Sequence, residues 1–378
     1  MAATRFTRWG LRESTSTSVD PMRIPHSQQP NSAKDQSGIA LIMVMVVVLA
    51  LGIMAAHFSF SMKIETRLAI NTTRDPDMEW MGRSGVELAK YVLAEKMTIP
   101  IENQFDSLNQ MWAGGPFGTN EVLAAISLRD VSLGDGLINV KIEDLERRFN
   151  VNVHGPAIIA QALLYMGVES FQSSVIMDSL MDWVDPDLMV RTNGADEEDY
   201  LAEPNPPFPP YLVKNGPIDD LSELLFIRGI TPEIYYGIPS SDSSMMPMGM
   251  GTGTFGLVDL FTTVGGFQVN INTASAAVLQ MIPGMDENLA FDIVMTRAGF
   301  DGMDGTEDDL PYVRIQDLLS VPSITPDVLQ SLRRYVTNRS NTFEVIVEAQ
   351  IDEYSRIYRA LIVRVSAREF AVLNMRWE

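Results

Sequence analysis

The sequence contains no cysteine, only three histidines and comparatively few basic side chains. The absence of cysteine excludes disulfides and thiolate catalysis, so cysteine content gives no indication of the redox compartment. The histidines are His26, His57 and His154, and their positions suggest neither a zinc triad nor a Ser/His/Asp set. The 49 acidic and 28 basic residues give a formal net charge of −21. Such a charge disfavours nucleic acid and anionic headgroups and favours cations.

A second scarcity concerns long apolar runs, because only one stretch could cross a membrane. Residues 39–56 are all apolar or glycine, and no charged residue lies between Asp35 and Lys63. Eighteen helical residues span about 27 Å, close to the hydrocarbon thickness of a bilayer, whereas a secretory signal core has only about 7–15 residues. The alternative is a buried core helix, but no other segment is apolar enough to surround it.

The charge before this stretch predicts its orientation. The basic residues there are Arg5, Arg8, Arg12, Arg23 and Lys34, and the acidic ones are Glu13, Asp20 and Asp35. A basic excess favours the cytoplasmic side, so we expect a single-pass protein with a cytoplasmic N-terminus and its body across the membrane. Residues 1–38 are rich in Ser, Thr and Pro, which predicts disorder.

The rest of the chain predicts an α+β fold. Helical spacing continues after the apolar stretch, with a break or kink expected at Asp75-Pro76. Alternation predicts a strand with Ile138, Val140 and Ile142 on one face, and an antiparallel meander near the C-terminus. In that meander one face carries Phe343, Val345, Val347 and Ala349, and another Leu361, Val363 and Val365, with Arg364 opposite. Turns are expected near 352–355 and 367–369.

Between these strands the signals are mostly helical, with Ser, Thr or Asp at several helix starts and Pro in several first turns. The predicted order is a transmembrane helix over 39–62, a first αβ part over 63–154, a helical insert over 155–341 and last strands over 342–378. A sheet interrupted by a large helical domain is therefore the expected architecture.

Several segments resemble the K-type minor pseudopilins of type II secretion systems. Gly38 between a charged leader and Ile39 resembles a prepilin peptidase site. The segments 182–201, 219–237 and 269–285 resemble matching segments of that family. The resemblance implies a pilin-like domain with a helical insert of the SAM-like or helix-hairpin-helix-like type. It also implies cleavage after Gly38, methylation of the new N-terminus, and location in the inner membrane with a periplasmic body.

One departure from the general pilin pattern is informative. Most pilins and pseudopilins have Glu as the fifth mature residue, where it neutralises the amine of a neighbouring subunit, but this chain has Met43. K-type members share this absence. The resemblance therefore implies a tip subunit that starts the pseudopilus with I-type and J-type minor pseudopilins above the major pseudopilin filament. Alternatives are a minor pilin that caps a type IV pilus or DNA-uptake filament, or a membrane-anchored hydrolase.

The segment 270–285 also resembles a helix-hairpin-helix, a unit that approaches a DNA phosphate through a glycine-rich turn. Here the turn runs from Pro283 to Glu287, one glycine is missing, and Asp286 and Glu287 stand where a phosphate would approach. Because DNA affinity depends on cationic contacts, we expect a packing unit and no nucleic acid.

Two acidic clusters are candidate calcium sites. The first lies in "GFDGMDGTEDDLPY" and contains Asp301, Asp304, Glu307, Asp308 and Asp309. Calcium binds about six to eight oxygen ligands, and glycine lets a loop wrap round it, although the spacing is not that of an EF-hand. The second cluster contains Asp182, Asp185 and Asp187, then Asp196, Glu197, Glu198 and Asp199. For both clusters the alternative is a solvated acidic surface, with the later residues of the second capping a helix. Members of the resembled family bind calcium in the helical domain.

Overall fold

The computed structural model describes residues 36–116, 121–154, 156–187, 189–195, 197–202, 211–237 and 255–378. The segment predicted to be disordered lies, up to residue 35, outside these ranges. The chain divides into two compact units, Met1–Ile70 and Asn71–Glu378, and each is described by itself.

Helix α1 (Gln36–Lys96) contains the apolar stretch and its amphipathic continuation. In the first unit its large apolar side chains are exposed throughout Ile39–Met62. The expected break at Pro76 is wrong, because the helix continues through this residue. A proline in a helix removes one N–H donor, and the regular hydrogen bonds on either side keep the two segments helical.

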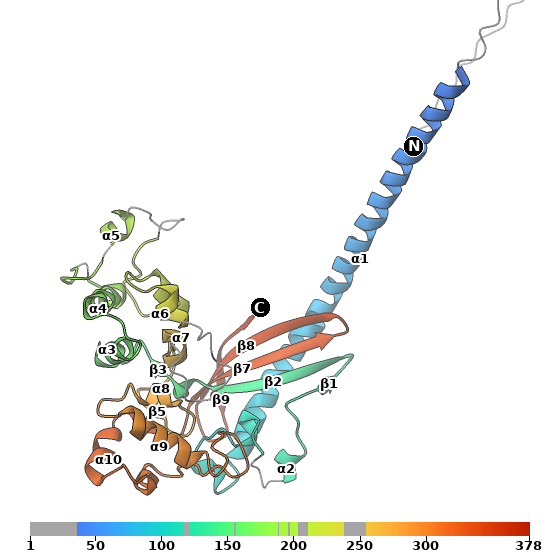
Figure 1. Cartoon of the computed structure of the whole chain (residues 1–378). Coiled ribbons are helices and arrows are strands. Elements are labelled where there is room, and N and C mark those ends of the chain that lie inside the picture. Colours follow the sequence, from blue (N-terminus) through green and yellow to red (C-terminus); the bar gives the residue numbers. More distant parts are fainter. Residues whose placement is uncertain are drawn as a thin grey trace, which may run out of the picture. The chain divides into compact units, whose positions relative to one another are not determined.

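The second unit contains a five-stranded antiparallel sheet in the order β1-β2-β7-β8-β9 (Figure 1). Its strands are β1 (Val131–Leu133), β2 (Gly136–Asp144), β7 (Thr342–Ile351), β8 (Tyr354–Arg364) and β9 (Phe370–Trp377). The predicted apolar faces of β2 and β7 are buried in one cluster with residues 78–93 of α1. The short elements α2 (Glu121–Ala124), η1 (Glu102–Gln104) and η2 (Met111–Ala113) connect α1 to β1.

Two glycines let α1 approach this sheet closely. A Cβ atom at Gly82 would lie 2.6 Å from the Tyr358 ring, and one at Gly85 would lie 2.5 Å from Val347. Real Cβ atoms do not make such close contacts, so the glycines set the distance between helix and sheet.

Strand β8 alternates as predicted, with Arg364 opposite Leu361 and Val363, and its buried face is the one that carries Arg364. Ala360, Ile362 and Arg364 are buried, whereas Leu361 and Val363 are half-buried and Val365 is exposed. A charged side chain is normally solvated, so alternation alone gives no reason to expect this face to be the buried one. Arg364 is buried because it forms an ion pair with Asp106 on that side of the sheet.

The helical insert occupies the chain between β2 and β7. Its elements are η3 (Leu145–Arg147), β3 (Phe149–Asn150), α3 (Pro156–Tyr165), α4 (Ser170–Val184), α5 (Glu197–Ala202), η4 (Leu221–Phe226), α6 (Pro232–Tyr236), α7 (Leu257–Leu260), β4 (Phe261–Thr262), β5 (Val269–Asn270), α8 (Ala276–Leu279), α9 (Glu287–Arg297), η5 (Ile315–Ser320), α10 (Pro326–Leu332) and β6 (Val336–Thr337). It has its own apolar core, separate from that of the sheet. The protein is therefore α+β, with an antiparallel sheet interrupted by a mostly helical domain.

The insert follows one plan twice. The first half (residues 149–262) and the second half (residues 269–337) each begin with a strand, continue through helices to a 3-10 turn and a Thr-Pro helix, and end with a strand. The first half contains α5 and α7 in addition. In each half the first and last strands pair in parallel, β3 with β4 and β5 with β6. The two short sheets therefore close two similar units.

An Asn-x-Asn sequence organises each of these units. In the first half the Asn152 side chain bonds both the N–H and the C=O of Ile218, each at 2.8 Å. In the second, Asn272 bonds the N–H and C=O of Tyr312 at 2.8 and 3.0 Å. Each side-chain amide thus donates to the carbonyl and accepts from the N–H of one backbone residue, as a neighbouring strand would. It satisfies these backbone groups where no strand is paired with them.

Candidate functional site

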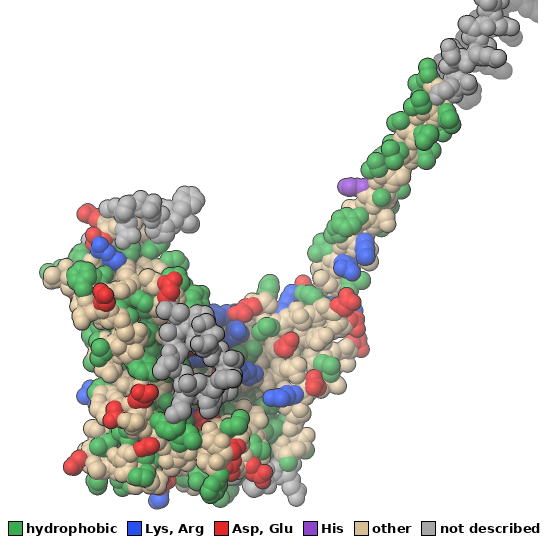
Figure 2. Space-filling view, viewed as in Figure 1, with side chains coloured by type: hydrophobic (Ala, Val, Ile, Leu, Met, Phe, Trp, Pro, Cys, Tyr) green, Lys and Arg blue, Asp and Glu red, His purple; other side chains and the backbone are tan. Residues whose placement is uncertain are grey.

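The first unit contains one helix that is long and apolar enough to cross a membrane. The span Ile39–Lys96 includes an 18-residue window of mean hydropathy 3.0, none of which is buried. Hydrophobic side chains line this helix in Figure 2. Gly38, Ile39 and Met43 all lie in α1, and the side chains of Ile39 and Met43 are exposed. The helix is consistent with a single-pass membrane anchor.

A buried ion triad lies where the sheet meets the insert. The Asp106 carboxylate accepts from Lys96 at the end of α1 and, at 3.1 Å to each oxygen, from Arg364 of β8. All three side chains are at most 4% exposed. Burial alone would raise the pKa of Asp106, but Lys96 and Arg364 lower it well below its usual range. Burial lowers the pKa of Lys96 to about 8 in spite of Asp106.

The triad continues into the insert through hydrogen bonds. The Asn270 amide donates to the Asp106 carbonyl at 3.0 Å and to Ser340 Oγ at 2.8 Å. The Asp144 carboxylate accepts from Ser340 and Thr273 at 2.6 and 2.5 Å, and its burial raises its pKa. We call the residues Lys96, Asp106, Asp144, Asn270, Thr273, Ser340 and Arg364 the junction network. Because every member is deeply buried, it fixes how the insert joins the sheet.

The first predicted calcium loop is closed mainly by donors from the protein itself. Asp304 forms a two-point ion pair with Arg297 at 2.9 and 2.7 Å. Asp308 accepts the N–H groups of residues 300 and 301, and Asp309 accepts that of residue 305. Asp301 accepts the N–H of residue 303, and Glu307 is exposed. Hydrogen bonding lowers the pKa of Asp308, and burial raises that of Asp309.

The second predicted cluster is divided by the fold. Arg191 pairs with both Asp182 and Asp185 at 2.6 Å, and Asp187 accepts the N–H of residue 189. Asp196 lies outside the described residues, while Glu197, Glu198 and Asp199 belong to α5. Within the described ranges, no group of three or more acidic, histidine or cysteine side chains is arranged to hold a metal ion. The calcium prediction is not tested by this arrangement and stays a prediction.

The helical hairpin of the second half carries its own acidic cap. Gly284 has a φ of +86°, which allows the turn before α9. The Asp286 side chain accepts the N–H of Leu289 at 2.8 Å, and Glu287 follows in the first turn. The helix terminus that could face a phosphate therefore meets a carboxylate of this chain.

Sequence reasoning missed the junction network. It also missed the pairs of bonds that the Asn152 and Asn272 side chains make to Ile218 and Tyr312, which we call the amide brackets. The repeated spacing Asn150-x-Asn152 and Asn270-x-Asn272 was a readable signal for the brackets. No local pattern indicated the partners of Asp106, because Arg364 is separated from it by 258 positions.

Comparison with known proteins finds family profiles that match the insert. A family profile described as "Type II secretion system (T2SS), protein K" matches residues 140–238, and a "Helix-hairpin-helix motif" profile matches residues 264–337. These ranges overlap most of the two halves of the insert.

Proteins named "Type II secretion system protein K" are similar over longer stretches. The protein from Klebsiella pneumoniae is 28% identical over 53% of this chain and 60% of its own length. That from Aeromonas hydrophila is 24% identical over 54% and 62%, and that from Pseudomonas aeruginosa 25% over 68% and 72%. The chain thus matches about three fifths of the length of the first two relatives.

A solved structure shares the fold. A chain in the crystal structure of the GspK-GspI-GspJ complex from enterotoxigenic Escherichia coli matches with a TM-score of 0.59 and 19% identity, covering 82% of this chain and 99% of that one. Together with the sequence matches, this fold supports the resemblance that the segments around 182–285 first indicated. The chain is therefore similar to the protein K family of type II secretion systems, in sequence over part of its length and in fold.

Proposed function

We propose that this protein is a minor pseudopilin that caps the tip of a pseudopilus and starts its assembly with I-type and J-type partners. Its relative occurs in a solved complex with GspI and GspJ, which supports these partners. The filament would serve protein export across the outer membrane, with α1 anchored in the lipid of the inner membrane and the second unit in the periplasm. The protein would be a structural subunit that neither catalyses a reaction nor binds nucleic acid.

The insert is the observation that carries this proposal. It has an apolar core of its own and is joined to the sheet by the buried junction network. A domain of this size beside a pilin-sized sheet would clash with a subunit stacked above it, and only the tip has no subunit above. Met43 in place of a fifth-position Glu supports the same location, since the chain lacks a group to pair with an amine ahead.

Co-expression with the I-type and J-type proteins of the same bacterium tests the assignment. We expect one stable complex whose native mass corresponds to one copy of each, and exported proteins that accumulate in the periplasm when this gene is deleted. A mass that requires several copies of this chain would contradict the proposal. Loss of pili with intact secretion would favour the type IV pilus alternative.

We propose in addition that prepilin peptidase cuts between Gly38 and Ile39 and that the new N-terminus is methylated. The intact mass of the membrane-purified chain should correspond to a start at Ile39, and Gly38→Val should block cleavage by crowding the scissile bond. A mature chain that starts at Met1, or one released after Ala56, would contradict this site.

Calcium binding to the 301–309 loop is a further proposal. Asp304 is already paired with Arg297, so Asp301 and Glu307 are the carboxylates with most capacity for an ion. Binding at a hundred times Kd would stabilise the protein by about 2.7 kcal/mol. The full chain in nonionic detergent should melt later with calcium than with chelator, and Asp301→Asn with Glu307→Gln should reduce this gap. An identical melting point at millimolar calcium would exclude a useful site.

A further inference from the structure

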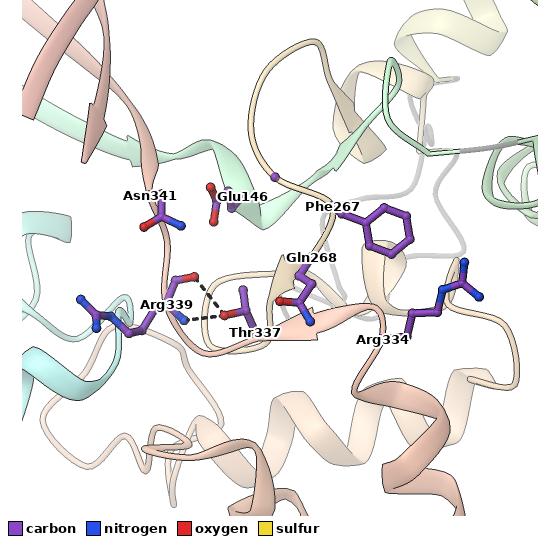
Figure 3. Close-up of a pocket in the computed structure, with 8 residues that line it drawn as sticks. Glu146, Phe267, Gln268, Arg334, Thr337, Arg339 and Asn341 are labelled. Atoms are coloured by element: carbon purple, nitrogen blue, oxygen red, sulfur yellow. Dashed lines mark hydrogen bonds between the residues drawn. The ribbon is translucent and has the colours of Figure 1, made fainter. Parts of the chain in front are cut away.

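A pocket of about 500 Å³ opens where the insert meets the sheet, and nothing in the proposed function uses it (Figure 3). Glu146 and Asn341 come from the two linkers to the sheet, and the loop 266–268 and the chain around Thr337 come from the insert. Arg334 and Arg339 lie at opposite sides of the pocket, with Thr337 and Gln268 between them (Figure 3). The pocket therefore has a cation at each end and polar groups along its length.

The two arginines contact aromatic rings and a sulfur atom, although the chain has a net charge of −21 and an excess of carboxylates. The Arg334 guanidinium lies 5.8 Å from the ring centres of both Phe267 and Tyr335. The Arg339 guanidinium contacts the sulfur of Met97 at 3.8 Å. Over the described ranges, neither forms an ion pair with a carboxylate. Ring stacking leaves the edge of a guanidinium, which carries its N–H donors, free for an anion.

A buried carboxyl group also lines the pocket. Glu146 is 4% exposed, and its Oε1 accepts from the Thr342 hydroxyl at 3.3 Å. Burial, with a further contribution from Asp144, raises the pKa of Glu146 to about 7. Below that pH the group is neutral and offers an O–H donor, and above it the group repels anions.

We propose that this pocket binds an extended acidic segment of a partner protein. Two separated arginines fit carboxylates that are spaced along a chain better than they fit one compact phosphate. The exposed amides of Gln268 and Asn341 lie between them. Gln268 uses one N–H for the Arg333 carbonyl at 2.9 Å, so its second N–H and its oxygen remain for a peptide main chain. The inference does not depend on the place of this chain in a filament.

A hexaglutamate peptide titrated into the full chain in nonionic detergent tests the site, with hexaglutamine as the uncharged control. We expect saturable binding of hexaglutamate alone. Arg334→Glu with Arg339→Glu should weaken it about tenfold or more, which corresponds to about 1.4 kcal/mol. The matched control is Arg83→Glu with Arg314→Glu, two exposed arginines that already have carboxylate partners. This control makes the same change in net charge and should leave affinity within about twofold.

Three outcomes would overturn the proposal. They are the absence of saturable binding, an equal loss in the control pair, and complete displacement of the peptide by inorganic phosphate or phosphatidylglycerol vesicles. The last result would indicate a site for a compact phosphate group.

The pH profile gives a second readout that a general loss of structure would not reproduce. The peptide is used with an acetylated N-terminus, because a free α-amino group would titrate near pH 8. Its glutamate side chains are almost fully ionised above pH 6, so its own titration does not interfere. Affinity should fall as pH rises from 6 to 8, and Glu146→Gln should abolish this fall. A pH dependence that is the same in the variant would remove Glu146 from the site and contradict the assignment.

Discussion

The two halves of the insert share their backbone brackets but differ in how they join the rest of the protein. Asn152 and Asn272 make the same pair of bonds to one backbone residue, and Thr231 and Thr325 cap corresponding helices at 3.4 Å. The asparagines two positions earlier, Asn150 and Asn270, differ in their hydrogen-bond partners. The Asn150 amide donates to Gly265 within the insert, whereas Asn270 reaches Asp106 in the junction network. Asn150 therefore bonds only within the insert, whereas Asn270 joins the junction network. The first half contacts the sheet through an exposed pair instead, Asp220 with Arg376 of β9 at 3.4 Å.

The acidic loops repeat this pattern of similarity and difference. Each follows the second helix of its half and is tied to that helix by an aspartate–arginine pair, Asp182 of α4 with Arg191 and Asp304 with Arg297 of α9. Arg297 is 3% exposed and also donates to the Ile271 carbonyl at 2.5 Å, whereas the side chain of Arg191 is 40% exposed. The comparison indicates that short local motifs give both halves the same backbone arrangement. The burial of the side chains then determines how much each contact contributes to stability.

The largest expected effect comes from breaking the attachment of the second half. Asp106→Ala leaves Lys96 and Arg364 buried without a counter-charge, so we expect a loss of about 3–5 kcal/mol in stability. Thermal unfolding of the full chain in detergent measures it. Asp352→Asn is the control, because Asp352 is 70% exposed, its pair with Arg74 should contribute less than about 1 kcal/mol, and Asn tolerates the φ of 53° at this position. Equal effects of both variants would contradict the role of the junction network.

The carboxyl group of Glu146 should make this attachment sensitive to pH. Its pKa is raised to about 7 from 4.5, so the fold favours the neutral acid. The contribution is fully present below about pH 4.5, declines as pH rises and is lost above about 7, by about 3 kcal/mol for a shift of this size. Glu146→Gln cannot ionise, so its melting point should rise relative to the native protein between pH 4.5 and 7. A constant difference across that range would exclude the raised pKa.

The brackets should differ in strength because they differ in burial. Asn272 is 2% exposed and Asn152 is exposed. Asn272→Ala strands the buried N–H and C=O of Tyr312 and should cost about 2 kcal/mol, whereas water can replace Asn152 at a cost of about 1 kcal/mol. Amide hydrogen exchange at Tyr312 and Ile218 in the two variants measures the local effect. A larger loss in Asn152→Ala would reverse the comparison.

The helix caps should show the smallest and most equal effects. Thr231→Ala and Thr325→Ala each remove one N-cap bond before a Pro in the first turn, and each should cost about 1 kcal/mol. Melting points of the two variants should agree within error. A difference of several degrees would show that the two helices contribute unequally despite their common sequence.

The sequence was sufficient for features that depend on local periodicity. The alternation of 343–349 and the apolar run 39–56 indicated their elements because each pattern repeats within one segment. The burial of Arg364 could not be predicted in this way, because its partner Asp106 lies far away in the chain. The protein partners of the loop carboxylates could not be predicted for the same reason, since Arg297 and the backbone donors reach them only in the folded loop.

The most direct test of the proposed tip location is to count where this chain lies on a filament. A small tag at Glu378, detected with gold-labelled antibody on sheared pseudopili, shows each position in the electron microscope. The account predicts one label at one end of each filament and none along the shaft. Labels at regular intervals along the shaft would contradict it.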